Sequence, residues 1–122
     1  MAYTNNLQTH NGLIGKLGED YACEYLISKN YKIIERNFKI RMGEIDIIAL
    51  KNYKLHIIEV KTSQSKQVRP EENMHAVKMR KVAKLGEVYS RGKLFCIDFI
   101  GASLNPNNTL HKITHIENLE IY

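Results

Sequence analysis

The feature that most constrains the fold is a stretch in which two apolar, strand-like runs each contain an acidic residue. Residues 43–61 read GEIDIIALKNYKLHIIEVK, with a polar connector, Lys51 to Lys54, between the two runs. Apolar runs of this length on either side of a short polar segment predict a β-hairpin. Asp46 and Glu59 are unusual inside such strands, so their placement decides what the hairpin can do.

The register of the hairpin decides whether the two acids meet. If Leu50 pairs with Leu55, the numbers of cross-strand partners add up to 105, and Asp46 faces Glu59. A register with a sum of 104 instead puts the two carboxylates on opposite faces, where they are ordinary edge charges. Opposed carboxylates are destabilising unless a positive charge lies between them. A hard divalent cation with oxygen ligands would supply that charge.

Two further charged residues belong to this arrangement. The register with a sum of 105 also places Glu44 opposite Lys61, so four ionisable groups would crowd the open end of the hairpin.

Upstream, apolar residues at helical spacing predict a helix over Leu13 to Lys29. Glu19 lies on the side of this helix that carries small and apolar residues. It is either a surface glutamate whose stem snorkels outward or an acid directed towards the hairpin.

These motifs carry a resemblance to known families. Gly43-Glu44-Ile45-Asp46, followed after twelve residues by Glu59-Val60-Lys61, is similar to the PD-(D/E)xK pattern of the restriction-endonuclease-like nuclease superfamily, with isoleucine in place of the proline. From about Gly12 onward the chain also resembles the YraN-like family of small bacterial proteins. The further residues that carry this second resemblance are Gly15, Gly18, Glu19, Arg36, Asn37, Ala76, Val77, Lys81, Asp98 and residues 115–118.

The order of predicted elements, α-β-β-β-α-β-β, indicates an α/β domain with a mixed central sheet flanked by helices. This order matches the restriction-endonuclease-like core that the resemblance implies. The length suits a single domain over residues 1–122, in which residues 1–12 are expected to be a flexible lead-in.

The resemblance implies a metal-dependent DNA endonuclease that hydrolyses phosphodiester bonds. Branched repair or recombination intermediates are candidate substrates, because archaeal Holliday-junction resolvases belong to the same superfamily. The implied cofactor is Mg²⁺, for which Mn²⁺ would substitute, held by Asp46, Glu59, the Val60 carbonyl and Glu19. Lys61 would act with the three acids as a catalytic residue. Resolvase-like enzymes commonly act on two-fold symmetric substrates, so a homodimer is a further expectation.

Basic residues give the chain a net charge of +5 and an isoelectric point near 9.2, which favours a polyanionic partner such as DNA. A basic cluster of Arg36, Lys39 and Arg41 precedes the acidic hairpin, where these residues would hold phosphates or, alternatively, neutralise Glu35 and Glu44. Lys81 stands within the apolar stripe of a second helix predicted over 73–89. Its match to the family pattern predicts that it reaches towards the active site or the DNA backbone.

Other features are compatible with an intracellular protein. Cys23 and Cys96 lack any paired spacing, which predicts free thiols in a reducing cytoplasm. No apolar run approaches membrane-spanning length, and the N-terminus lacks the layout of a signal peptide. His111 and His115 are predicted to share a strand face without a third ligand nearby, which argues against a zinc site.

Two other classes of function compete with the nuclease hypothesis. A non-catalytic nucleic-acid-binding module with a nuclease-like fold would share the basic surface and would not require a metal. A protein-interaction domain would show no salt-dependent affinity for DNA.

Overall fold

The computed structural model of the protein describes residues 10–64 and 76–119. Its elements are α1 (His10–Ser28), β1 (Lys32–Ile40), β2 (Gly43–Lys51), β3 (Lys54–Ser63), α3 (Ala76–Ser90), β4 (Phe95–Leu104) and β5 (Leu110–Ile116). The predicted α/β class and the order α-β-β-β-α-β-β are confirmed. Across these two ranges, no helix is both long and apolar enough to span a membrane.

The sheet has five strands in the order β1-β2-β3-β4-β5. Strands β1, β2 and β3 form an antiparallel meander, and β4 and β5 form an antiparallel pair. Strand β4 runs parallel to β3, so the chain must cross over between them, and α3 lies within that crossover. The sheet is therefore mixed, as predicted, and its parallel pair includes the strand that carries Glu59 and Lys61.

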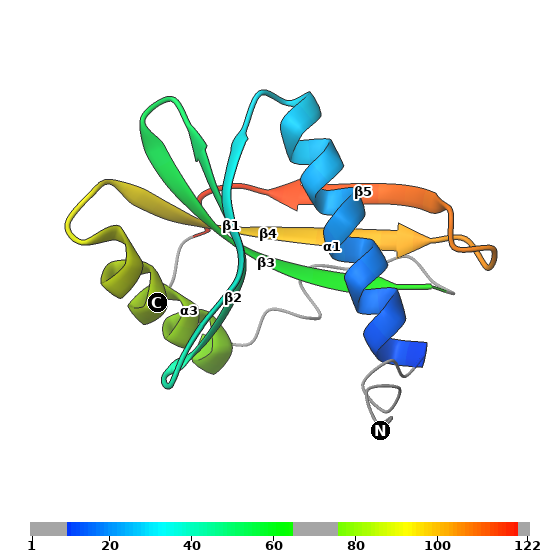
Figure 1. Ribbon diagram of the computed structural model, residues 1–122, viewed down its shortest axis with the longest axis horizontal. Helices are drawn as coiled ribbons and strands as arrows, with labels where there is room; N and C mark the ends of the chain where they lie inside the picture. The colour runs from blue at the N-terminus through cyan, green and yellow to red at the C-terminus, as the bar shows by residue number, and fades with distance from the viewer. Residues whose placement is uncertain (1–9, 65–75, 120–122) are drawn as a thin grey trace, which may run out of the picture.

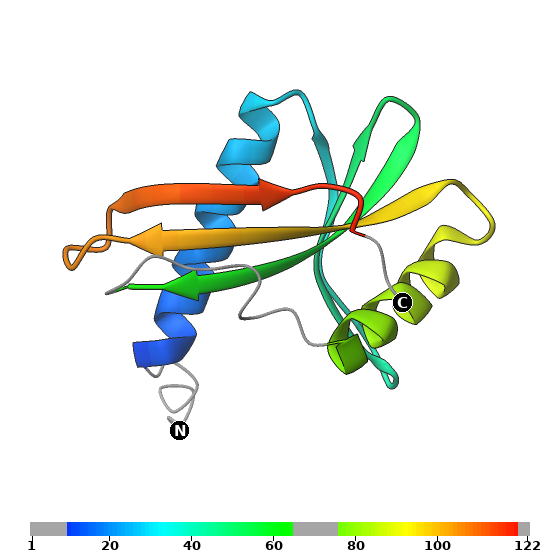
Figure 2. The same cartoon turned by 180° about the vertical axis from the view of Figure 1, so that it is seen from behind.

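The two helices cover opposite faces of the sheet. Figures 1 and 2 show α1 crossing in front of β3, β4 and β5 in one view and behind them in the other. One core cluster joins Ala22, Cys23 and Leu26 of α1 to Ile47, Ala49, Ile58 and Ile100 of the sheet. The second cluster joins Met79, Val82 and Leu85 of α3 to Ile45, Ile48, Leu55, Ile57 and Ile97. Each strand of the hairpin is thus anchored in both cores, which fixes its register.

The β2–β3 hairpin has the register with a sum of 105. Ile47 pairs with Ile58 and Leu50 pairs with Leu55, so the alternative sum of 104 is excluded. The predicted four-residue connector was wrong, because Lys51 and Lys54 pair with each other and leave a two-residue turn. Asn52 and Tyr53 form that turn with φ of 52° and 65°. Two positive φ values match the type I′ geometry that favours tight hairpins, and the shorter turn leaves the register unchanged.

Some predicted boundaries also needed correction. Helix α1 begins at His10, so residues 10–12 are helical and do not belong to a flexible lead-in; residues 1–9 lie outside the described part. The polar loop predicted from Thr62 begins later, because β3 continues to Ser63. Most of that loop, and the predicted helix start at residues 73–75, fall outside the described residues.

A close approach at Gly18 brings α1 against the end of β3. A Cβ added to Gly18 would lie 2.7 Å from Thr62 Cβ and nearer still to the Thr62 hydroxyl. Real side chains do not approach this closely, so the helix can pack at this distance only without a side chain at Gly18. The contact sits one residue before Glu19 and one residue after Lys61, which are both predicted site residues.

We therefore expect Gly18→Ala to destabilise the fold, by about 2 kcal/mol in the free energy of unfolding, because α1 must move away from β3. Gly15→Ala, on the same helix, is the matched control: a Cβ there meets nothing within 4 Å. Alanine at Gly15 should be neutral or should stabilise the helix by up to about 1 kcal/mol. Urea denaturation of both variants measures the difference, and equal stabilities would contradict the close-packing argument.

Candidate metal and active site

Asp46 reaches from β2 towards β3 at the position where the two strands begin to separate. Ile47 and Ile58 form the last backbone pair of the ladder, and Asp46 and Glu59 are the residues that directly follow this pair on the two strands. The Asp46 carboxylate accepts a hydrogen bond of 2.8 Å from the backbone N–H of Val60. Glu59 itself is only 8% exposed. The two acids are thus held at one place by backbone contacts between neighbouring strands.

The electrostatics at Asp46 show that its carboxyl group lies close to other acids. Burial and then the charge of Glu59 raise the pKa of Asp46 to about 7, against the opposing hydrogen bond from Val60. Glu19 and Glu44 raise the pKa further. A carboxylate in such surroundings either keeps a proton near neutral pH or binds a cation. The predicted meeting of Asp46 with Glu59 is therefore supported by hydrogen bonding and by charge.

Glu44 does not take the predicted position opposite Lys61. The β2–β3 ladder ends before Glu44, which pairs instead with Lys39 of β1. Its carboxylate accepts a 3.4 Å hydrogen bond from the side-chain amide of Asn37. The strands diverge beyond Ile47, so extending the register to Glu44 was wrong.

Asn37 is a site residue that sequence analysis did not identify as functional. Its amide nitrogen donates to Glu19 at 3.1 Å as well as to Glu44, and so it links α1 to β2. Asn37 has a φ of 52°, a conformation that asparagine tolerates better than most residues. The Arg36-Asn37 motif was the available signal, but nothing in its pattern indicates a bridge between two acids.

Glu19 and Lys61 lie on the same cavity. A cavity of about 450 Å³ is lined by Ile14, Gly15, Glu19, Val60, Lys61 and Thr62. The Glu19 side chain is 20% exposed, so it faces inward from α1 and is not a fully solvated surface glutamate. Lys61 is exposed at the end of β3. Of the predicted metal-binding and catalytic residues, the cavity brings together Glu19, Val60 and Lys61. Asp46 joins them through its hydrogen bond from Val60, and its pKa responds to the charges of Glu59 and Glu19.

The three predicted phosphate-binding residues are not brought together. Arg36 forms a 2.7 Å ion pair with Asp20 and lies 3.7 Å from Glu19. The alternative partners predicted for Arg36, Glu35 and Glu44, were also wrong, because its ion pairs are with two acids of α1. Glu35 instead accepts a hydrogen bond from Tyr89. Arg41 is exposed in the turn after β1.

Lys81 is exposed on α3 and does not lie within its buried stripe. That stripe consists of Met79, Val82 and Leu85. Because α1 and α3 cover opposite faces of the sheet, Arg36 and Lys81 lie on different sides of the molecule. Their contacts with DNA remain a prediction.

A second polar cluster was missed. His115 was predicted to have no third ligand nearby, but this was wrong: its Nε2 lies 2.9 Å from Asp98, and Glu117 is beside both. Asp98 is completely buried and also contacts His56 at 2.8 Å. An aspartate inside the apolar strand FCIDFIGASL was the same kind of signal as Asp46 in β2. His111, by contrast, is exposed.

The fold and site together define an α/β domain whose central hairpin carries a buried acidic pair beside a helix glutamate. The model of a family described as "Uncharacterised protein family UPF0102" matches residues 18–102. The chain is 40% identical over 112 residues to a UPF0102 protein of Caldanaerobacter subterraneus subsp. tengcongensis, covering 86% of this chain and 92% of that protein. It is 38% identical over 117 residues to one of Clostridium botulinum (strain Alaska E43 / Type E3), covering 91% and 96%. The chain therefore belongs to the UPF0102 family, which is the YraN family that its motifs resemble.

The raised pKa of Asp46 predicts how stability depends on pH. Between the ordinary value of 3.8 and about 7, the folded state keeps a proton that the unfolded state has lost. The unfolded state then binds fewer protons, so stability falls as pH rises through this range. Asp46→Asn removes the titrating group, and in EDTA it should stabilise the protein at pH 8 by about 1–3 kcal/mol, with little effect at pH 4.

Urea denaturation of Asp46→Asn and the parent protein at both pH values measures this difference. Glu24→Gln, an exposed acid on α1, is the control and should follow the parent at both pH values. A loss of stability in Asp46→Asn at pH 8 would show that the aspartate charge is favourable where it stands.

Proposed function

We propose that the protein is a Mg²⁺-dependent DNA endonuclease that hydrolyses phosphodiester bonds. The observation that carries this proposal is the pair of Asp46 and Glu59, in which burial and then the charge of Glu59 raise the pKa of Asp46 to about 7. Repulsion between the two carboxylates lowers the stability of the fold, and a divalent cation bound between them would relieve that repulsion. The Glu59-Val60-Lys61 segment of β3, which is similar to the (D/E)xK half of the nuclease pattern, agrees with this interpretation.

The residues at this site fit Mg²⁺ because they offer hard oxygen donors in a partly enclosed space. Asp46, Glu59, the Val60 carbonyl and Glu19 would hold it. When bound, the ion would supply a nucleophilic hydroxide at neutral pH and neutralise charge on the phosphate. A cavity bordered by Glu19 and Lys61 would leave room for water and one substrate phosphate.

The chain's own residues have separate tasks in this proposal. Lys61 would hold the attacking water or stabilise the negative charge that develops on the phosphate. Asn37 acts as a positioning residue, because it donates hydrogen bonds to both Glu19 and Glu44. The N–H of Val60 holds the Asp46 carboxylate against β3. The site is therefore supported by α1 and three neighbouring strands.

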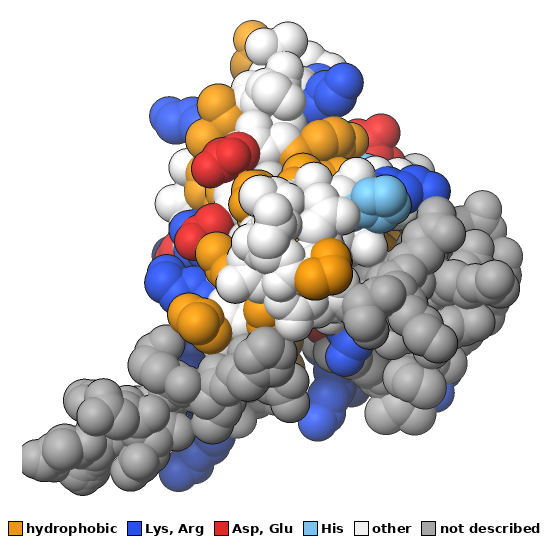
Figure 3. Space-filling view, turned by 90° about the vertical axis from the view of Figure 1, so that its right-hand side faces the viewer, with side chains coloured by type: hydrophobic (Ala, Val, Ile, Leu, Met, Phe, Trp, Pro, Cys, Tyr) orange, Lys and Arg blue, Asp and Glu red, His pale blue; other side chains and the backbone are white. Residues whose placement is uncertain are grey.

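DNA binding would rest on charges spread over the surface. Figure 3 shows Lys and Arg side chains at separate places on one side of the molecule, interspersed with Asp and Glu. Arg41 and Lys81 are exposed and available to phosphates, whereas Arg36 is already paired with Asp20. Each single phosphate contact would then add modestly to the affinity for DNA, and the net charge of +5 would attract the DNA backbone over the whole surface.

A cleavage assay with Mg²⁺ or Mn²⁺ on branched, flapped and linear DNA tests the proposal. Asp46→Asn, Glu59→Gln and Lys61→Ala should each lower the cleavage rate by about 100-fold or more, since each removes a group that acts on the reacting phosphate. Glu24→Gln, which changes an exposed acid on α1, is the control and should cleave DNA like the parent protein. Full activity in Asp46→Asn and Glu59→Gln would defeat the proposal.

Salt dependence of DNA binding separates catalysis from binding. Arg41→Ala and Lys81→Ala should each reduce the slope of log affinity against log salt by about 1, because each loses one phosphate contact. Lys93→Ala is the control: Lys93 is exposed next to Leu94, which bonds Leu55 at the far end of β3 from Lys61. Binding that is unaffected by EDTA, with no cleavage under any metal, would indicate a non-catalytic DNA-binding module instead.

A further inference from the structure

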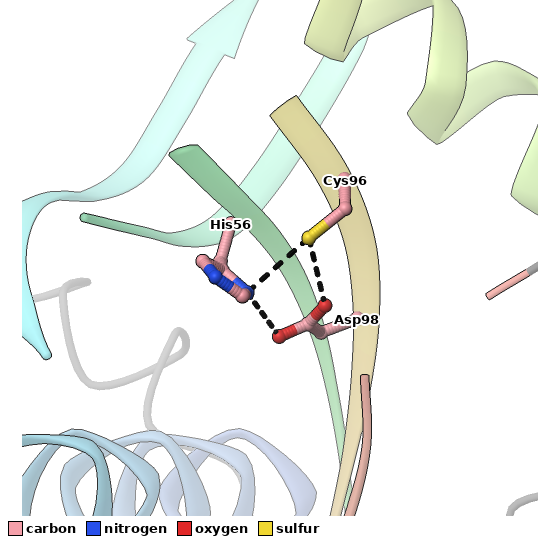
Figure 4. A group of neighbouring side chains, drawn as sticks. All are labelled: His56, Cys96 and Asp98. Carbon is pink, nitrogen blue, oxygen red and sulfur yellow. Dashed lines mark hydrogen bonds and ion pairs between the residues drawn. The ribbon is translucent and has the colours of Figure 1, made fainter. Parts of the chain in front are cut away.

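A second group of metal-binding side chains lies in the middle of the sheet, away from the acidic pair. His56 of β3 and Cys96 of β4 are cross-strand partners, and Asp98 follows two residues later on β4. Figure 4 shows the three side chains pointing towards one another. All three are buried, with exposed fractions of 4%, 6% and 0%. Their ligand atoms all lie within 4.8 Å of one another.

The distances in this group are close to those around a tetrahedral zinc ion. Cys96 Sγ lies 3.3 Å from His56 Nδ1 and 3.4 Å from Asp98 Oδ1. Ligand atoms about 2.0–2.3 Å from a tetrahedral Zn²⁺ stand about 3.5 Å apart. Asp98 Oδ2 is 2.8 Å from His56 Nδ1, so this edge must open by roughly half an ångström. In the Asp98 carboxylate, Oδ1 faces the Cys96 thiol and Oδ2 faces the His56 ring.

The donor set selects the kind of metal. A thiolate, an imidazole and a carboxylate suit Zn²⁺, whereas Mg²⁺ prefers oxygen donors alone. The cluster therefore differs in chemistry from the all-oxygen site at Asp46 and Glu59. The two sites would discriminate between these cations by ligand type.

The surroundings of Asp98 resemble the outer shell of a metal site. His115 Nε2 donates to Asp98 Oδ2 at 2.9 Å, and the N–H of Asn118 donates to Oδ1 at 3.0 Å. His115 is itself held by a 3.0 Å hydrogen bond between its Nδ1 and the hydroxyl of Tyr25. Hydrogen bonds of this kind fix the orientation of a metal-binding carboxylate. In spite of burial, hydrogen bonds from His115, His56 and Asn118 lower the pKa of Asp98, so this residue is an anionic carboxylate that can serve as a metal ligand.

We propose that His56 Nδ1, Cys96 Sγ and the carboxylate of Asp98 form a binding site for one Zn²⁺ ion. The ion joins β3 to β4, and His115 and Asn118 hold its carboxylate ligand from β5 and the segment after it. Binding displaces the thiol proton of Cys96, because the thiolate is the ligand, so that proton passes to the solvent. The site is independent of the proposed nuclease chemistry and has no role in cleavage.

Titration of the metal-free full-length chain with Co²⁺, a spectroscopic probe for zinc sites, tests this proposal. We expect a thiolate-to-cobalt charge-transfer band that saturates at one Co²⁺ per chain, with loss of this band on addition of Zn²⁺ and no loss with excess Mg²⁺. Cys96→Ser should abolish the band and weaken Zn²⁺ binding by about 100-fold or more. His115→Gln should keep the band and weaken binding by about 10- to 100-fold, as expected for an outer-shell residue.

Cys23→Ala is the matched control, because the chain has two cysteines and this change leaves Cys96 as the remaining thiol. The band must persist in Cys23→Ala, a result that assigns it to Cys96 even if Cys96→Ser does not fold. Asp46→Asn should leave the band unchanged, which separates this site from the proposed Mg²⁺ site. Absence of the band in the parent protein, or its loss in a folded Cys23→Ala variant, would overturn the proposal.

Discussion

Repulsion between the half-buried carboxylate of Asp46 and the buried carboxylate of Glu59 is the constraint on which the rest of the site depends. The two acids directly follow the last backbone pair of the β2–β3 hairpin, and two hydrophobic clusters on opposite faces of the sheet fix the register of that hairpin. A shift by one residue would move Ile47, Ile48, Ile57 and Ile58 out of their cores, so the packing energy holds the acids together against their repulsion. The fold thereby imposes an unfavourable arrangement that a bound cation would relieve.

The remaining site residues follow from how α1 meets the sheet. Gly18 allows the helix to approach Thr62, and the next residue, Glu19, then faces the cavity beside Lys61. Asn37 ties Glu19 to the hairpin from the other side. Backbone proximity at one glycine and one bridging amide therefore place a helix glutamate within electrostatic reach of Asp46. The candidate site is a product of tertiary packing as much as of the hairpin motif.

Sequence analysis predicted the parts of this arrangement that depend on local patterns. The apolar runs predicted the hairpin and left two registers open, of which the register with a sum of 105 is observed. The two acids in these runs predicted the acidic pair. Features that depend on tertiary packing, such as where strands diverge and how a helix meets the sheet, could not be predicted from local sequence patterns. The divergence of β2 from β3 moved Glu44 to β1, and the packing of α1 gave Arg36 the partner Asp20 instead of Glu35 or Glu44. The cluster around Asp98 was missed because its residues come from three segments that only the parallel β3–β4 pairing brings together.

The most direct measurement of the central claim is anomalous X-ray scattering from crystals of the protein soaked in Mn²⁺. The account predicts an anomalous peak bordered by the carboxylates of Asp46 and Glu59 and by the Val60 carbonyl, and the loss of this peak in crystals of Asp46→Asn. Mn²⁺ bound elsewhere, with the two carboxyl groups pointing away from each other, would contradict it.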